Sequence, residues 1–272
     1  MSRIDQVFQT ASQAQRMTFM PFVTAGDPST AGTAEVLKAL RDAEVDLIEL
    51  GFPYSDPIAD GPVIQASYTR SLDSGVTVTS ILDMVESLRD QQLPPILAMV
   101  SFAIIFRYGT EKFVARAAEA GFSGLIVPDL PADEADELAA SAKAHHLDLV
   151  QLIAPTTAPE RVQQILKASS GFVYCVSVAG TTGARKELPV ELIQQLKQLR
   201  QATSLPLAVG FGISGPDQVA ALEGVADGVI VGSAIVKQIS EAPSIQQACD
   251  SVKQFSQSMR NAVDHVKPSL KS

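Results

Sequence analysis

The most informative stretch of the chain is Leu47-Ile-Glu-Leu-Gly-Phe-Pro-Tyr-Ser-Asp-Pro-Ile-Ala-Asp-Gly-Pro62, which begins as a strand and ends as a loop. The run from Asp46 to Leu50 is mostly apolar and is long enough for one buried strand. Gly51 and Pro53 then end this strand, because glycine permits unusual backbone dihedrals and proline has no N–H for a sheet ladder. The polar residues that follow predict a long loop.

This stretch carries two acidic residues in different settings. Glu49 interrupts the apolar run, and because burying an unpaired charge is expensive, a Glu at this position needs a reason. Asp60 lies on the loop, about one loop-length further on. Two carboxylates in different surroundings can hold different protonation states at one pH, which suits acid–base catalysis. The structural alternative is that Asp60 caps a helix and that backbone donors satisfy Glu49 at the strand end.

Short apolar strands alternate with amphipathic helical segments along the whole chain of 272 residues. The strands are mostly continuous apolar runs, as expected for parallel strands that are covered on both faces. The predicted strands are Phe19–Val23, Asp46–Leu50, Ile96–Val100, Gly124–Val127, Leu149–Ile153, Phe172–Val178, Leu205–Val209 and Gly228–Val231. Eight strands, each followed by a helix, predict an α/β fold, a single (β/α)₈ TIM barrel. A doubly wound open sheet is the alternative.

The helical segments at the two ends of the chain add to this barrel. An extra helix, Ile4–Gln15, precedes the first strand, and a short extra helix, Ile235–Ser240, follows the eighth. A closing helix is predicted over Ser244–His265. We expect one barrel domain over residues 1–272, in which 266–272 form a flexible tail.

Composition excludes several classes of function. A net charge of −9 argues against nucleic acid or an anionic membrane as the main partner. Cys175 and Cys249 form no C-x-x-C pair, and the histidines lack metal-ligand spacing, so we predict no disulfide framework and no metal. No cofactor is expected either. The longest apolar stretch, Ile96 to Phe106, is too short for a membrane span of ~20 residues. With no visible secretory signal, a cytoplasmic protein is expected.

Glycine-rich turns follow the last two predicted strands. In such barrels the loops after the strands form the active face, and phosphate often binds after strands seven and eight, beside the N-terminus of a short helix. Gly210-Phe-Gly212 and Gly232-Ser233 occupy these positions, and Gly183 can add a third edge. The sequence therefore predicts a phosphate site. Each glycine pattern taken alone could also be an ordinary tight turn that binds nothing.

Large apolar side chains lie at or near the ends of the predicted strands, and they include Phe22, Met99, Leu125, Ile153, Tyr174 and Phe211. Ordinary barrel core explains most of them. Beside a phosphate site, they also suggest a pocket for a flat apolar group. The residues thus indicate a barrel enzyme that takes a phosphorylated substrate with an apolar body and works with two carboxylates and no metal.

Several motifs resemble the tryptophan synthase alpha chain family along nearly the whole length of the chain. They are Pro21-Phe-Val-Thr-Ala-Gly-Asp-Pro28, the stretch from Leu47 to Pro62, Val127-Pro-Asp-Leu-Pro131, Gly180-Thr-Thr-Gly183, Val209-Gly-Phe-Gly-Ile-Ser214 and Asp227-Gly-Val-Ile-Val-Gly-Ser233. The resemblance implies a lyase of tryptophan biosynthesis that splits indole-3-glycerol phosphate into indole and glyceraldehyde 3-phosphate by a retro-aldol cleavage.

The resemblance also implies roles for individual residues. Glu49 matches the family's catalytic Glu, which acts as general acid and then as base, and Asp60 matches the second acid, which stays ionised and accepts the indole N–H. The implied substrate-binding residues are Phe22, Tyr174 and Phe211 around the indole, Thr182 after the sixth strand, and Gly183, Gly212, Gly232 and Ser233 at the phosphate.

The family works as an α₂β₂ tetramer with a beta chain that uses pyridoxal phosphate and receives indole through a tunnel. The loop around Asp56 corresponds to part of the docking surface, and the segment from Gly180 to Pro189 corresponds to a lid. One segment departs from the family: Val100-Ser-Phe-Ala-Ile-Ile-Phe-Arg107 has Ala103 where the family usually has an Asn. This departure bears on the beta-chain contacts more than on the chemistry.

Two other functions remain open at this point. An isomerase or epimerase of phosphorylated sugars explains the glycine turns but not the long stretch from Glu49 to Pro62. A catalytically quiet barrel that activates a partner enzyme fits the apolar Ala103, although the presence of both acids argues against it.

Overall fold

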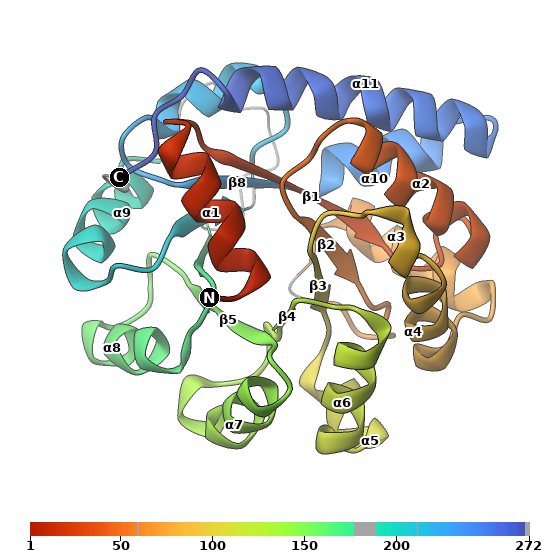
Figure 1. Cartoon of the computed structure of the whole chain (residues 1–272), viewed down its shortest axis with the longest axis horizontal. Coiled ribbons are helices and arrows are strands. Elements are labelled where there is room, and N and C mark those ends of the chain that lie inside the picture. The colour runs from red at the N-terminus through yellow and green to blue at the C-terminus, as the bar shows by residue number, and fades with distance from the viewer. Residues whose placement is uncertain (59, 177–188, 211, 270–272) are drawn as a thin grey trace.

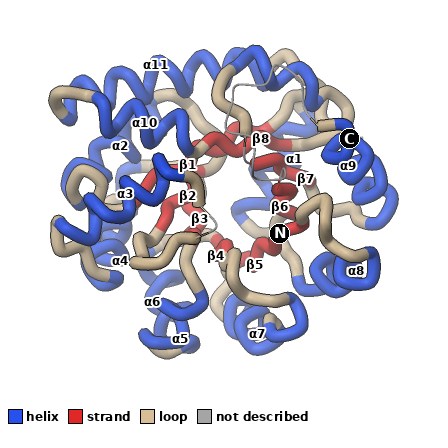
Figure 2. Tube along the Cα trace, turned by 180° about the vertical axis from the view of Figure 1, so that it is seen from behind, coloured by secondary structure: helices blue, strands red, loops and turns tan. Residues whose placement is uncertain are grey.

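Eight parallel strands close into a barrel in the computed structural model, which describes residues 1–58, 60–176, 189–210 and 212–269. The strands pair in chain order, and the eighth pairs with the first. They form a ring surrounded by helices (Figure 2). Their bounds are β1 Thr18–Thr24, β2 Ile48–Gly51, β3 Ile96–Met99, β4 Gly124–Ile126, β5 Asp148–Ile153, β6 Val173–Val176, β7 Leu207–Gly210 and β8 Gly228–Val231. The closed ring confirms the predicted barrel and excludes the open sheet.

Helices cover the outside of the ring (Figure 1). Their bounds are α1 Arg3–Gln13, α2 Thr30–Asp42, α3 Pro62–Asp73, α4 Val78–Ser87, α5 Phe102–Tyr108, α6 Thr110–Ala120, α7 Asp136–Ala144, α8 Pro159–Ala168, α9 Val190–Ala202, α10 Ser233–Glu241 and α11 Ile245–Val263, with 3-10 helices over Arg89–Gln91, Ala132–Glu134 and Pro216–Leu222. The predicted extra helices are confirmed as α1 and α10. No helix within the described part of the chain is long and apolar enough to cross a membrane.

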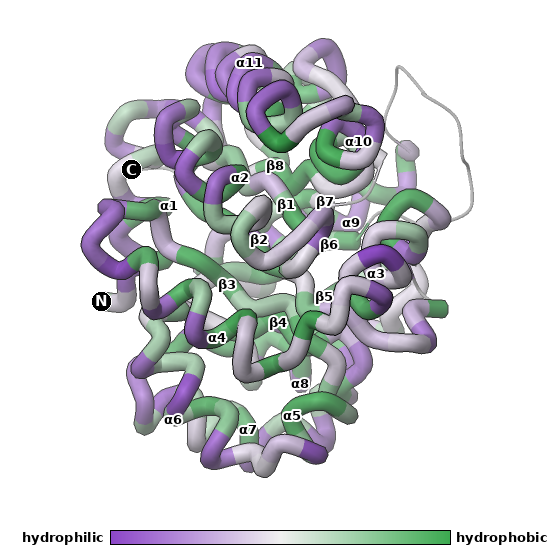
Figure 3. The backbone as a smooth tube through the Cα atoms, turned by 90° about the vertical axis from the view of Figure 1, so that its right-hand side faces the viewer, coloured by the Kyte–Doolittle hydropathy of each residue, from purple (hydrophilic) through white to green (hydrophobic). Residues whose placement is uncertain are grey.

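Apolar side chains form two separate layers. The larger cluster lies between the strands and the helices, and the smaller one fills the barrel. In Figure 3 the strands are largely hydrophobic, whereas the helices carry hydrophilic residues. Ile4 and Phe8 of α1 join the inner cluster, where the ring of Phe8 packs on Phe172 with centroids 5.5 Å apart. Helix α1 therefore closes the N-terminal end of the barrel.

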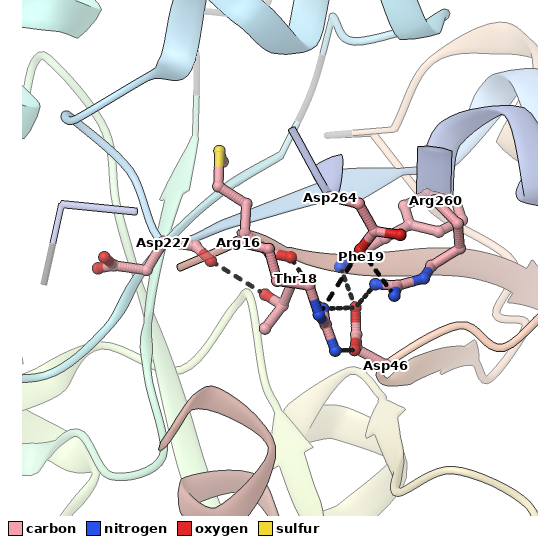
Figure 4. A network of polar contacts seen from close by, with 8 residues as sticks. Arg16, Thr18, Phe19, Asp46, Asp227, Arg260 and Asp264 are labelled. Carbon is pink, nitrogen blue, oxygen red and sulfur yellow. Dashed lines mark hydrogen bonds and ion pairs between the residues drawn. The ribbon is translucent and has the colours of Figure 1, made fainter. Parts of the chain in front are cut away.

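One predicted strand boundary is wrong, and the residue concerned belongs to a charged network near this closed end. Asp46, expected to begin the second strand, precedes β2, which starts at Ile48. Its carboxylate accepts hydrogen bonds from Arg16 at 2.8 Å, from Arg260 at 2.7 Å and from the backbone N–H of Phe19 at 2.8 Å (Figure 4). Asp46 thus joins the entry of β1 to α11, since its partners come from both segments.

Two further segments differ from expectation. Helix α5, which lies at the end of the apolar stretch from Ile96 to Phe106, was not predicted. The segment predicted as one helix from Ala132 to His146 is divided into a 3-10 turn and α7. Within the expected tail, Lys267 accepts a hydrogen bond from Gly224 N–H at 3.0 Å, and the hydroxyl of Ser269 donates to Asp227 at 2.8 Å.

Candidate active site

Glu49 projects into the barrel near the carboxyl end of β2. It is level with Phe22 of β1 and Leu97 of β3, which both belong to the inner apolar cluster. Its side chain is buried, with 1% of the residue exposed. Neither carboxylate oxygen has a hydrogen-bond partner among the residues that the structure describes. The predicted alternative, in which backbone donors satisfy Glu49, therefore finds no support in the described contacts.

Burial determines the protonation state of Glu49. It raises the pKa of this carboxyl from 4.5 to about 8, and repulsion from Asp60 adds to the effect. The cause is desolvation, which penalises the charged form of an acid. At neutral pH Glu49 is therefore mainly a neutral acid that can donate a proton.

Asp60 lies on the loop between β2 and α3 and is less deeply buried. Burial raises its pKa from 3.8 to about 6, while a hydrogen bond from the phenol of Tyr54 opposes this change. At pH 7 Asp60 is consequently mainly ionised. One site thus holds a neutral acid and a carboxylate, which is the pattern expected when environments push the pKa values of two acids apart.

Two buried tyrosines lie close to these acids. The pKa of Tyr174 is raised well above its ordinary value by burial and by the charges of Glu49 and Asp60, and the pKa of Tyr68 is raised by burial and by the same two acids together with Tyr54. Both phenols therefore stay protonated and can only act as neutral groups here. Tyr174 comes from β6 and Tyr68 from α3, so the site draws on elements far apart in the sequence.

Two glycines make room for the aromatic rings. A Cβ on Gly51 would lie 2.5 Å from Cζ of Phe22, and a Cβ on Gly210 would lie 2.4 Å from the ring and hydroxyl of Tyr174. Since real Cβ atoms do not approach so closely, any larger residue would displace these rings. The glycines at the ends of β2 and β7 therefore shape the apolar side of the barrel mouth.

The N-terminus of α10 lies on the same side. Gly232 precedes this helix, Ser233 is its first residue, and no described side chain caps its free N–H groups. A Cβ on Gly232 would lie 3.5 Å from Phe22, so this turn borders the aromatic wall. Gly212 has a φ of +90°, which favours glycine. Uncapped N–H groups at a helix N-terminus suit an anion.

Comparison with known proteins identifies the family. The family model described as tryptophan synthase alpha chain matches residues 8–264. The chain belongs to the tryptophan synthase alpha chain family. It is 43% identical to the tryptophan synthase alpha chain of Rhodopirellula baltica, over 97% of this chain and 99% of the relative. It is 48% identical to that of Prochlorococcus marinus, over 88% and 87% of the two chains.

Solved structures of the family have the same fold. The tryptophan synthase subunit alpha of Legionella pneumophila superposes with a TM-score of 0.89 at 35% identity, covering 98% of this chain and 100% of that one. A chain of Mycobacterium tuberculosis tryptophan synthase gives 0.89 at 33% identity, covering 96% and 98%. At these identities and coverages, the barrel described above is the fold of the family.

Of the residues that the sequence singled out, the structure brings together Glu49, Asp60, Phe22, Tyr174 and Gly232. Glu49, Asp60, Phe22, Tyr174, Gly212, Gly232 and Ser233 are described, and Thr182, Gly183 and Phe211 lie outside the described residues. Sequence reasoning missed Tyr54 and Tyr68, because a tyrosine in a loop or helix carries no local signal of a distant acid. No group of three or more metal-ligating side chains occurs among the described residues.

Proposed function

We propose that this member of the tryptophan synthase alpha chain family cleaves indole-3-glycerol phosphate, with Glu49 moving the protons and Asp60 holding the indole N–H. Family membership supports the reaction. The observation that supports the two roles is the pair of buried acids whose pKa values are raised to about 8 and about 6. No comparable support exists for a sugar-phosphate isomerase or for a catalytically quiet activator.

The reaction requires two proton transfers around one broken bond. Neutral Glu49 protonates C3 of the indole, so that the ring becomes a leaving group and positive charge develops at its nitrogen. The bond from C3 to the glycerol carbon then breaks, its electrons return to the ring, and the adjoining hydroxyl becomes the aldehyde as its proton passes to ionised Glu49. Ionised Asp60 accepts the indole N–H and stabilises the positive ring. A positioned acid–base group contributes ~10²–10⁴-fold in rate.

The remaining predicted residues hold the substrate. Phe22 and Tyr174 border the indole, together with Phe211. We assign the phosphate to the N-terminus of α10, where Gly232 and Ser233 offer N–H groups, and we keep Gly212, whose φ is +90°, as a further predicted phosphate residue. Thr182 and Gly183 complete the proposed site. The protein needs no cofactor of its own for this chemistry.

We further propose that a beta chain docks on the active face in an α₂β₂ tetramer, and that the complex is cytoplasmic. Two large apolar side chains support a docking surface: Ile58 on the loop after β2 is 93% exposed, and Phe106 of α5 is 73% exposed. Both belong to segments that follow strands at this face. The apolar Ala103 lies on the same helix as Phe106, so the partner surface facing α5 should be apolar as well.

The direct test is indole release from indole-3-glycerol phosphate, alone and with a beta chain, by the wild type and by Glu49→Gln. We expect indole from the wild type and a loss of ~10²–10⁴-fold in kcat for the variant, because a Gln cannot transfer the protons. Thermal unfolding of both proteins controls for folding. The absence of indole under both conditions would contradict the proposed lyase activity. A fully active variant would show that Glu49 does not transfer the protons.

A further inference from the structure

We propose that Tyr54 and Gln65 are positioning residues for Asp60, one holding its carboxylate and the other its backbone. The inference rests on the proposed function, because it gives the two residues a task in indole cleavage. Sequence reasoning assigned a role to neither residue, although Tyr54 lies in the stretch from Leu47 to Pro62. Their contacts converge on Asp60 from two sides of the loop between β2 and α3.

Gln65 fixes the backbone of this loop from the first turns of α3. Its side-chain amide donates to the carbonyl oxygen of Asp60 at 2.7 Å and to that of Pro57 at 3.2 Å. The N–H of Asp60 in turn donates to the carbonyl of Pro57 at 3.1 Å. The backbone of Asp60 is therefore held at both its N–H and its carbonyl group, which restricts where the carboxylate can point.

Tyr54 holds the carboxylate itself. Its phenol lowers the pKa of the Asp60 carboxyl by hydrogen bonding. Its ring packs against buried Tyr68 of α3 with centroids 5.5 Å apart and planes at 52°, which fixes the ring beside this helix. A hydrogen bond donated to a carboxylate favours the ionised form. Tyr54 therefore opposes the burial that favours protonation of Asp60, and it preserves the charge that the indole N–H needs.

Helix α3, which supplies Gln65 and Tyr68, is anchored firmly to the end of β1. The hydroxyls of Ser67 and Thr24 are 2.6 Å apart, and the hydroxyl of Ser71 donates to the carbonyl of Ala25 at 2.6 Å. Arg70 makes two hydrogen bonds to buried Asp27, at 2.9 and 2.7 Å. Groups on a fixed helix position a loop residue more precisely than groups on another loop do, and Tyr54 is tied to this helix by its contact with Tyr68.

The decisive variant is Tyr54→Phe, which keeps the ring contact and removes the hydroxyl. Without that hydrogen bond Asp60 binds a proton at higher pH, so the acid limb of kcat/KM for indole formation should move upward by about one pH unit. On the acid side the variant should then be about tenfold slower than the wild type, and the difference should shrink above neutral pH. Tyr108→Phe on α5 is the matched control, and its pH profile of kcat/KM should superimpose on that of the wild type.

Gln65→Met provides a second, independent test. It removes the donor to the backbone, so we expect kcat to fall by roughly tenfold through misplacement of Asp60, with the acid limb unmoved. Gln257→Met, at an exposed position of α11, is the control. The double variant Tyr54→Phe/Gln65→Met should lose less kcat/KM than the product of the two single fold-losses, because both substitutions act on Asp60.

The results separate this inference from the function on which it rests. A wild type that forms no indole contradicts the proposed function. If the wild type forms indole, an unmoved acid limb in Tyr54→Phe, or an equal loss at every pH, overturns the role of Tyr54. Full activity of Gln65→Met overturns the role of Gln65, and that test stands even if Tyr54→Phe does not fold.

Discussion

At the scale of single residues, the burial of Glu49 affects both its proposed role as an acid and the stability of the fold. The pKa of this buried carboxyl is about 8 in the folded chain, against 4.5 ordinarily. Between pH 4.5 and about pH 8, Glu49 therefore keeps its proton in the folded chain and loses it in the unfolded chain. Because the folded-state pKa is raised, the contribution of Glu49 to stability is fully present below pH 4.5 and is lost as the pH rises through about 8.

Glu49→Gln should remove this pH dependence. In the wild type, ionisation of Glu49 should lower the free energy of unfolding by at most ~1.4 kcal/mol for each unit that the pH rises between 4.5 and about 8. A neutral Gln has no proton to lose in this range. Urea unfolding from about pH 5 to about pH 8 measures the difference between the two proteins. Glu35→Gln, at an exposed position on α2, should keep the wild-type slope. Equal slopes in the wild type and Glu49→Gln would show that Glu49 is not held neutral.

At the scale of elements, the N-terminus of α10 should bind the phosphate. Gly232→Asp places a carboxylate among the N–H groups of this turn, so we expect weaker binding of glyceraldehyde 3-phosphate, by at least about tenfold in Kd. Gly232→Ala is the matched control, because its Cβ would lie 3.5 Å from Phe22, an ordinary contact. Calorimetric titration measures both variants. An unchanged affinity of Gly232→Asp would contradict the assigned phosphate position.

The elements also show where sequence reasoning succeeds and where it ends. Local signals explain helix ends such as those of α2 and α6: Ser29 caps α2, and Gly121 ends α6 with a φ of +104°. Helix α5 was missed because a distant residue helps to start it. Asp129, which follows β4, accepts hydrogen bonds from Ser101 at 2.6 Å and from the N–H of Phe102 at 2.8 Å. A sequence pattern carries no trace of a partner that folding brings from another strand.

At the scale of the whole molecule, closure of the barrel brings together residues that lie far apart in the sequence. Asp46 meets Arg260 across 214 positions of the chain, and this contact joins the start of the barrel to its last helix. At the other end, β2 supplies Glu49, its following loop supplies Asp60, and β6 supplies Tyr174. The sequence predicted the two acids as a pair, but the depth of their burial, which separates their pKa values, comes from the closed barrel.

The pH profile of kcat/KM for indole formation tests the central claim, that Glu49 acts as a neutral acid beside an ionised Asp60. The account predicts a bell with an acid limb near pH 6, where Asp60 is protonated, and a basic limb near pH 8, where Glu49 is ionised. Asp60→Asn, slower overall, should lose the acid limb. A profile that stays flat from about pH 5 to about pH 9 would contradict the claim.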